Sequence, residues 1–157
     1  LAAAFRHSLS TAMLGTASTT GEPDASVVAT LLDERGAFII YVSGLTAHTR
    51  HLRANPRASV LLLEPEGAAT QALARRRLTF ACTAEAVGRD MAEHAALVVQ
   101  FRAKFGAAVD LLAGLPDFQL MRLVPQSGRL VAGFGAAFEV DPLDWSKLTP
   151  VGRPRGA

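Results

Sequence analysis

The feature that most constrains the fold is a succession of short apolar runs separated by turn residues. From about Gly15 the chain reads "LGTAST", the turn "TTGEPD", "ASVVATLLD", the turn "ERG" and "AFIIYVSG". β-rich runs separated by a few Gly, Pro and Asp residues are typical of antiparallel strands that pair in chain order. We therefore predict three neighbouring strands in a meander.

Further strands and helices are predicted along the rest of the chain. Strands are expected at "ASVLLLE", "RRRLTFACTAEAVG", "FQLMRLVP" and "RLVAGFGAAFEV", with "QSG" as the turn between the last two. Apolar residues four apart predict an amphipathic helix over residues 1–14, and helices are also expected within 45–57 and 91–116. These helices interrupt the strands irregularly, which argues against a doubly wound parallel sheet.

We predict a mainly β fold with helices (α+β), namely an antiparallel split β-barrel of six to seven strands. An N-terminal helix and helical insertions accompany the barrel, which leaves no unpaired strand edges. Residues 1–141 should form this domain, and residues 142–157, rich in Pro and Gly at their end, should form an irregular tail. A chain of 157 residues has the size of one domain.

Composition indicates a folded protein and excludes some function classes. Half of the residues are hydrophobic and 19% are charged, and no apolar run approaches the roughly 20 residues needed to cross a bilayer. Sixteen basic against 14 acidic residues give a net charge of +2, so no nucleic-acid or membrane partner is expected. A single cysteine, Cys82, within an apolar run fits a small buried side chain and a reducing cytoplasm. Because the first residue is Leu1, the chain is expected either to have been trimmed, for example by removal of a leader, or to begin within a longer product.

Familiar catalytic motifs are absent from the sequence, and no catalytic residue is identifiable. There is no Walker loop, GxGxxG, GxSxG or HExxH motif. His48 and His51 are three residues apart and could ligate a metal, but neither an acidic residue nor a cysteine lies beside them. His7 and His94 fall in separate helices. We therefore expect no metal site.

The segment from Tyr41 to Glu64 carries an unusual density of hydrogen-bonding side chains. Ser43, Thr46, His48, Thr49 and Arg50 follow a strand and open a helix, a pattern that offers hydroxyls, ring N–H groups, a guanidinium and helix amides to one anion. Phosphate binding is one interpretation. The other is that Thr46 caps the helix while Arg50 and His51 face water.

The chain also resembles a known family. The order of strands and the phrases "SGLTAHTRHL", "NPRASVLL", "RRLTFACTAEAVG" and "RLVAGFGAA" resemble the pyridoxamine 5′-phosphate oxidase-like FMN-binding split barrels. Within that superfamily they look most like the haem-utilisation (HugZ-type) branch. The resemblance covers about residues 1 to 140.

The resemblance implies an FMN site at the interface of a homodimer. Ser43, Thr46, His48, Thr49 and Arg50 would hold the phosphate. Ser26 and Val27 on the preceding strand would line the same pocket. Arg77 occupies the place where the oxidases present a glutamine to the flavin ring.

Some positions depart from the oxidase pattern. Ala25 and Thr30 stand where the oxidases carry an arginine and a lysine that grip the phosphate, and Val131 stands where they show a tryptophan. The oxidases' substrate-binding C-terminal Arg and His segment has no counterpart, so vitamin B6 oxidation is not expected.

The haem branch implies a further residue. Haem-degrading members use a histidine from a C-terminal segment as iron ligand, and no histidine follows His94. Either that ligand is lost, or it lies outside this chain, or haem is not the ligand.

Three functions follow from these observations. The first is an FMN-binding flavoprotein, a possible FMN-dependent oxidoreductase acting on an unidentified small molecule. The alternatives are a haem-binding or haem-degrading protein on the same barrel, with haem in place of FMN, and a non-catalytic dimeric split-barrel module.

Overall fold

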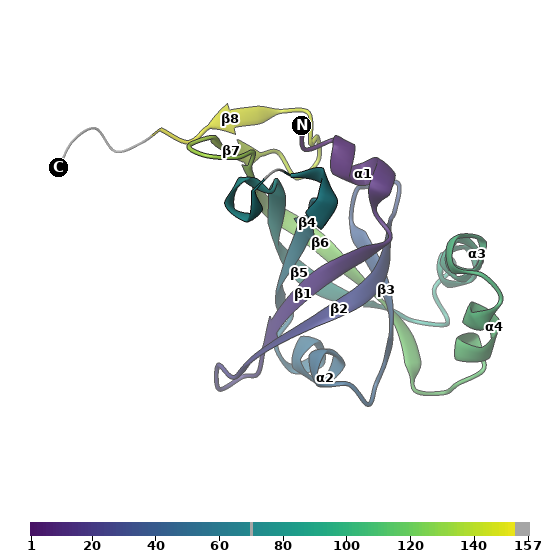
Figure 1. The fold of residues 1–157 in the computed structure, drawn as a ribbon. Helices are drawn as coiled ribbons and strands as arrows, with labels where there is room; N and C mark the ends of the chain where they lie inside the picture. The colour runs from purple at the N-terminus through teal and green to yellow at the C-terminus, as the bar shows by residue number, and fades with distance from the viewer. Residues whose placement is uncertain (70, 153–157) are drawn as a thin grey trace.

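The strands pair almost entirely with their sequence neighbours, and the pairing closes on itself. A computed structural model describes residues 1–69 and 71–152. Strands β1 to β6 pair in the order β3-β2-β1-β4-β5-β6, and β3 also pairs with β6, which closes a six-stranded antiparallel barrel (Figure 1). Two further strands, β7 and β8, extend the sheet from β6. The strands are β1 (Thr11–Ala17), β2 (Pro23–Leu32), β3 (Phe38–Ser43), β4 (Arg57–Leu63), β5 (Arg77–Val87), β6 (Phe118–Val131), β7 (Ala137–Val140) and β8 (Leu148–Pro150). The predicted fold class is confirmed.

Helices lie at the two ends and on one side of the barrel. In Figure 1, α2 lies at one end, α1 lies with β7 and β8 at the other, and α3 and α4 lie beside the wall. In the described ranges, no helix is long and apolar enough to span a membrane. The helices are α1 (Ala4–Ser8), α2 (Ala47–Ala54), α3 (His94–Phe105) and α4 (Ala108–Ala113), with 3-10 turns η1 (Glu66–Ala68) and η2 (Ala72–Ala74).

Besides its pairing with β5, strand β6 pairs with two other strands along its length. Its first part closes the barrel against β3, from Phe118 opposite Ser43 to Leu123 opposite Phe38. Its last part pairs with β7. The predicted turn at "QSG" is wrong, because β6 runs through it as a β-bulge, where Pro125 and a following extra residue shift the register against β5.

The real turn between β6 and β7 lies in "AGFGA". Gly133 and Gly135 there have φ angles of 122° and 73°, which glycine adopts without steric cost. The run "RLVAGFGAAFEV" is therefore two strands and a turn, not one strand.

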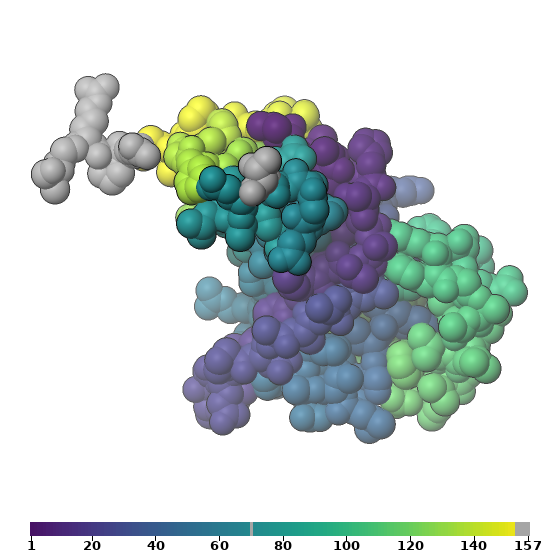
Figure 2. Space-filling view, in the orientation of Figure 1, coloured from purple at the N-terminus to yellow at the C-terminus, as the bar shows by residue number. Residues whose placement is uncertain are grey.

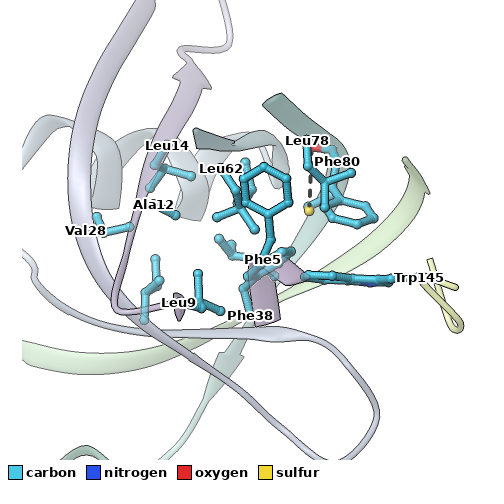
Figure 3. Packing of buried hydrophobic residues seen from close by; sticks show 14 of the residues in the cluster. Phe5, Leu9, Ala12, Leu14, Val28, Phe38, Leu62, Leu78, Phe80 and Trp145 are labelled. Atoms are coloured by element: carbon cyan, nitrogen blue, oxygen red, sulfur yellow. Dashed lines mark hydrogen bonds between the residues drawn. The ribbon is translucent and has the colours of Figure 1, made fainter. Parts of the chain in front are cut away.

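Alternate residues of the strands fill the barrel with one apolar core. Within this core the Phe80 ring lies 4.8 Å from the Trp145 ring and 5.6 Å from the Phe38 ring, measured between centroids (Figure 3). Trp145 is only 2% exposed. It belongs to the tail from Pro142 that was predicted to be irregular. Residues 142–147 have no regular secondary structure, as predicted, but β8 follows them, so the tail is not irregular throughout. Residues 153–157 lie outside the described residues.

The predicted N-terminal helix over residues 1–14 is much shorter. Only Ala4–Ser8 are helical, and the chain enters β1 at Thr11. The buried positions of β1 alternate through Ala12, Leu14 and Thr16, because β1 pairs with β2 on one edge and with β4 on the other. Pairing on both edges outweighs the helical preference of the local sequence.

Helices α3 and α4 cover the outside of the barrel where β3 and β6 meet. A second apolar cluster forms there, in which Leu97 and Phe101 of α3 and Val109 of α4 pack with Ile39 and Leu120 of the strands. Arg122 of β6 reinforces this arrangement through ion pairs to Asp33, at 3.0 Å, and to Glu93, at 2.8 Å. Figure 2 shows the two helices, in green, on one side of the molecule.

Glu64 ties the η1–η2 loop to the barrel at the end opposite α2. Its side chain is 9% exposed and accepts hydrogen bonds from the Arg76 backbone N–H, at 3.0 Å, and from Arg76 Nε, at 2.8 Å. Arg75 donates to the Glu64 carbonyl through Nε and Nη2. The hydrogen bonds from Arg76 lower the pKa of Glu64 below its usual value.

Gly128 gives a test of how tightly the barrel core is packed. A Cβ at this position would lie 2.6 Å from Phe80 Cε1 and 3.0 Å from Val140 Cβ, and the Phe80 ring is held by its aromatic neighbours. We expect Gly128→Ala to lower the free energy of unfolding by about 1 to 3 kcal/mol. The measurement is chemical and thermal denaturation. Gly67→Ala is the control, because nothing lies within 4 Å of its Cβ position; equal stability of both variants would contradict the packing.

Glu64 gives a second test, based on pH. A carboxyl whose folded-state pKa is lowered adds stability above its unfolded pKa and loses that contribution as pH falls through the folded pKa. We expect Glu64→Gln to be less stable than wild type at neutral pH, with the difference shrinking in acid. Urea denaturation from pH 7 to pH 3 measures this, with the exposed neighbour Glu66→Gln as control. An unchanged pH dependence in Glu64→Gln would refute the assignment.

Candidate functional site

The segment that leads from β3 into α2 forms one end of the barrel. Gly44, directly after β3, donates its backbone N–H to the Asp117 carbonyl at 2.7 Å, and Ser43 Oγ donates to Asp117 Oδ2 at 2.5 Å. A Cβ on Gly44 would lie 3.2 Å from both the Asp117 carbonyl oxygen and Arg53 Nη2. The close approach of these groups explains the glycine before the helix.

Most of the hydroxyl groups predicted to bind phosphate are engaged within the segment itself. Thr46 Oγ1 donates to the Ser43 carbonyl at 2.9 Å and lies 2.9 Å from Thr49 Oγ1. Thr49 is 0% exposed. Arg50 is exposed, and its Nη1 donates to the Leu45 carbonyl at 2.7 Å. Among these residues only Arg50 has a charged side chain exposed to solvent. A role of the segment in cofactor binding stays a prediction.

Both histidines of α2 turn one ring nitrogen toward the end of the barrel. His48 Nδ1 lies 3.1 Å from Ser26 Oγ of β2, and His51 Nδ1 lies 3.1 Å from Thr16 Oγ1 of β1. Burial lowers the pKa of His48, an effect that Asp24 opposes and His51 reinforces. Among the described residues, no group of three His, Cys, Asp or Glu side chains is placed to hold a metal ion.

Ser26 and Val27 lie on opposite sides of β2. Ser26 faces α2, whereas Val27 points away from the barrel and is 69% exposed. Successive residues of a strand alternate between its faces, so one protomer does not bring both into one pocket. The only ionisable side chain on β2 is Asp24, which is acidic. Thr30, at one of the positions where the oxidases carry a basic residue, is buried and donates to the Ile39 carbonyl at 3.0 Å.

Arg77 lies at the other end of the barrel from α2. Thr16, the neighbour of His51, pairs with Ala58 of β4, and Leu63, five residues further along β4, pairs with Arg77. Five residues of strand span about 17 Å. A single protomer therefore does not place Arg77 beside the α2 residues. The two arginines that precede it, Arg75 and Arg76, are both bonded to Glu64.

A broad apolar surface was missed by the sequence reasoning. The outward residues of β1, β2, β4 and β5 lie in register across the sheet and are almost all small or apolar. We call this surface the outer face; it consists of Met13, Gly15, Ala25, Val27, Ser59, Leu61, Thr79 and Ala81. The signal was present in the sequence, since "AMLGTA" and "ASVVAT" are apolar or small on both alternating faces.

Two open grooves meet on the outer face. One, of about 450 Å³, is lined by Thr16, Asp24, Asn55 and Arg57 among others, near α2. The other, of about 490 Å³, is lined by Thr79, Ser127, Arg129 and Glu139 among others, near β7. Both include Ala81, so the grooves adjoin. Each combines an apolar floor with one arginine and one carboxylate, which suits a flat ligand with charged substituents.

Comparison with known proteins places the chain in a family. The family model described as pyridoxamine 5′-phosphate oxidase matches residues 2–132. Haem oxygenase HutZ of Vibrio cholerae is 37% identical over 136 residues, which are 87% of this chain and 77% of that protein.

Solved structures show the same relationship. The crystal structure of HutZ, the haem storage protein from Vibrio cholerae, matches with a TM-score of 0.76 and 34% identity over 83% of this chain and 91% of that one. A haem-binding protein from Mycobacterium smegmatis matches with a TM-score of 0.75 and 31% identity, over 90% of this chain and 57% of that one. The resemblance predicted from the sequence is confirmed, and this chain belongs to the pyridoxamine 5′-phosphate oxidase family, with relatives of the haem-utilisation type.

Proposed function

We propose that this protein binds haem, as a haem-binding or haem-degrading member of its family. The observation that carries the proposal is the 37% identity to a haem oxygenase over 136 residues. The shared barrel, at a TM-score of 0.76 to a haem storage protein, supports it. FMN, the first cofactor expected from the sequence, has less support, because the relatives named here are haem proteins.

The chemistry of the outer face agrees with a haem ligand. Haem is a flat, mostly apolar ring with two carboxylate groups, so its site needs apolar area bordered by cations. The outer face provides the apolar area, and Arg57 and Arg129 border its two grooves. Both arginines are exposed in a single protomer.

We further propose a homodimer in which the outer faces of two copies meet. The outer face is apolar, and within the described residues no helix packs across β1 or β4 on that side. A two-fold axis perpendicular to the strands exchanges the two ends of the barrel, which would bring Arg77 of one copy toward α2 of the other. The residues that one chain keeps about 17 Å apart would then share a site.

A cytoplasmic location fits the single thiol. Cys82 is buried, and its burial raises the pKa of the thiol to about 12, so thiolate chemistry is suppressed. An unreactive, unpaired cysteine is typical of a reducing compartment.

FMN binding is the second candidate, favoured by one observation. Arg50 lies exposed at the first turn of α2, where helix amides and a guanidinium together can hold a phosphate. The other groups fit the phosphate less well, since Thr46 and Thr49 bond to each other and Asp24 is the only charge on β2. When bound, FMN would supply redox chemistry, and Arg50 would bind its phosphate.

Adding ferric haemin to the purified protein tests the first proposal. We expect a saturating Soret band distinct from that of free haemin and, with a reductant and oxygen, its replacement by biliverdin-like absorbance if the protein degrades haem. Hydrogen bonds to charged groups contribute about 1.5–3 kcal/mol, so Arg57→Glu and Arg129→Glu should each weaken binding roughly tenfold or more. Arg35→Glu, on the exposed β2–β3 turn, is the matched control. A haemin spectrum that does not change when the protein is added would exclude the proposal.

A flavin arm of the same titration separates the second candidate from the first. If FMN binds, its absorbance and quenched fluorescence should titrate to saturation, and Arg50→Ala should abolish this while leaving haemin binding intact. Protein that remains colourless after incubation with FMN removes this candidate.

The homodimer proposal is tested by placing one charge on the outer face. Val27 and Val99 are both exposed, at 69% and 65%, but only Val27 lies on the outer face. Like charges that meet in an interface cost several kcal/mol, so Val27→Asp should weaken dimerisation by roughly 100-fold or more and Val99→Asp should not. Light scattering after size exclusion reports the mass. A monomeric wild-type protein, or a dimer unaffected by Val27→Asp, would disprove the arrangement.

A further inference from the structure

Gly15 is a glycine that the fold of a single chain does not explain. It lies in the middle of β1, which pairs with both β2 and β4, and it is not one of the glycines with a positive φ angle. A Cβ at Gly15 would come no closer than 3.6 Å to Ser59 Cβ, which is an ordinary van der Waals contact. A glycine inside a strand weakens it and often marks a place where another backbone or a ligand approaches closely. An approach from outside the chain would account for this residue.

Gly15 belongs to a row of small residues that crosses the outer face, which we call the small row. Strand pairing aligns Gly15 with Ala25 of β2 and with Ser59 of β4, and it aligns Ser59 with Ala81 of β5. The next row, two residues away on each strand, is a ridge of larger side chains formed by Val27, Met13, Leu61 and Thr79. The outer face is therefore a shallow trough beside a ridge, and side chains of facing sheets interdigitate when their shapes match in this way.

The small row is the place where two outer faces can come closest together. The row on its other side also contains small residues, Ala17 of β1 and Pro23 of β2, which pair with each other. If a two-fold axis lies between the faces and runs along the small row, the ridge of each copy lies over that third row of the other, so that Met13 faces Ala17 of the second copy. An axis along the ridge would make large side chains meet their own copies and would leave a void above Gly15, whereas stable interfaces are packed as densely as protein interiors.

The outer face and its border are large enough for a stable dimer. The outward residues are the alternate positions of 11–17, 23–29, 57–63 and 77–83, four on each strand, and among them only Arg57 and Arg77 are charged. Outward residues repeat about every 6.8 Å along a strand and strands lie about 4.8 Å apart, so this surface spans roughly 500 Å² before the relief of its side chains is counted. Standard interfaces bury about 800 Å² of accessible surface on each partner. Because accessible area exceeds the flat span, a second copy of the chain is a partner of suitable size.

We propose that the two-fold axis of the homodimer runs across the strands along the small row, so that Gly15 and Ser59 of one copy contact the same residues of the other. This inference rests on the proposed homodimer and assigns the line along which its two copies meet. Because Gly15 has no side chain and Ser59 has a short one, the two sheets approach more closely here than the about 10 Å that is usual for facing sheets. The ridge of each copy then fixes the register between the copies.

Cysteine cross-linking tests the position of the axis, because the one native cysteine, Cys82, is only 4% exposed. Ser59→Cys places a thiol on the proposed axis, and Leu61→Cys, two residues away on the same face of β4, is the matched control. A disulfide needs Cα atoms about 4.4–6.8 Å apart, whereas the two copies of Leu61 would lie about 14 Å apart along the strands. The full chain is oxidised with oxidised glutathione and run on a gel without reductant, and light scattering gives its mass before oxidation.

We expect Ser59→Cys to become mostly a covalent dimer that dithiothreitol reverses, and we expect Leu61→Cys to stay without a cross-link. Gly15→Ala fits within one chain, which circular dichroism checks, but its two added methyl groups collide across the axis. Overpacking of this kind should raise the dimer Kd roughly fivefold or more. Gly67→Ala, which lies outside the outer face and has nothing within 4 Å of its Cβ position, should leave the Kd unchanged.

The outcomes separate this inference from the homodimer on which it rests. Wild-type protein that is monomeric overturns both. A dimeric wild type in which Leu61→Cys cross-links as well as Ser59→Cys, or in which neither variant does, overturns the position of the axis and leaves the dimer standing. A dimer Kd that is unchanged in Gly15→Ala overturns the close approach at Gly15.

Discussion

The pairing of β3 with β6 is the contact on which the rest of the structure depends. It joins residues about 80 positions apart, from Phe38 with Leu123 to Ser43 with Phe118, and turns a six-stranded sheet into a barrel without edges. Closure places Phe38 against Phe80 and allows Trp145 to complete the aromatic centre. It also creates the ridge that α3 and α4 cover, held by Arg122.

A closed barrel has two open ends, and the way in which each end is covered explains where the polar side chains are concentrated. One end is sealed by Phe5 of α1 and by Trp145. At the other end α2 contributes Leu52 to the core, but its remaining inward side chains meet the rim of the strands, where hydroxyls and carbonyls are available. The density of Ser, Thr and His residues after Tyr41 is therefore, in large part, how a helix docks onto the end of a barrel.

Much of the fold was predictable because most strands pair with a neighbour in the sequence and are separated from it by recognisable turn residues. The failures have distinct causes. Residues 11–14 have a helical pattern, but pairing with β2 and β4 makes them a strand, and "QSG" is a bulge because β5 continues beside it. Trp145 sits in a Pro-containing stretch, and only the aromatic pair inside the barrel gives it a place.

The cofactor-binding role of the candidate residues stays a prediction, and their arrangement was not predictable from the sequence. Sequence reasoning predicted that the segment around His48 binds phosphate; it could not tell that Thr49 is wholly buried or that Ser26 and Val27 face opposite ways. The outer face was not predicted because a strand that is apolar on both faces has the same sequence pattern whether one face or both faces are buried.

Trp145 links the beginning of the chain to its last described strand. Its ring stacks on Phe80 and lies under the Arg6 guanidinium, so the first helix and nearly the last described residues seal the same pole of the barrel (Figure 1). A chain without Trp145 would lack the ring that packs against Phe38 and Phe80, so residues at both ends of the described chain contribute to the same part of the core.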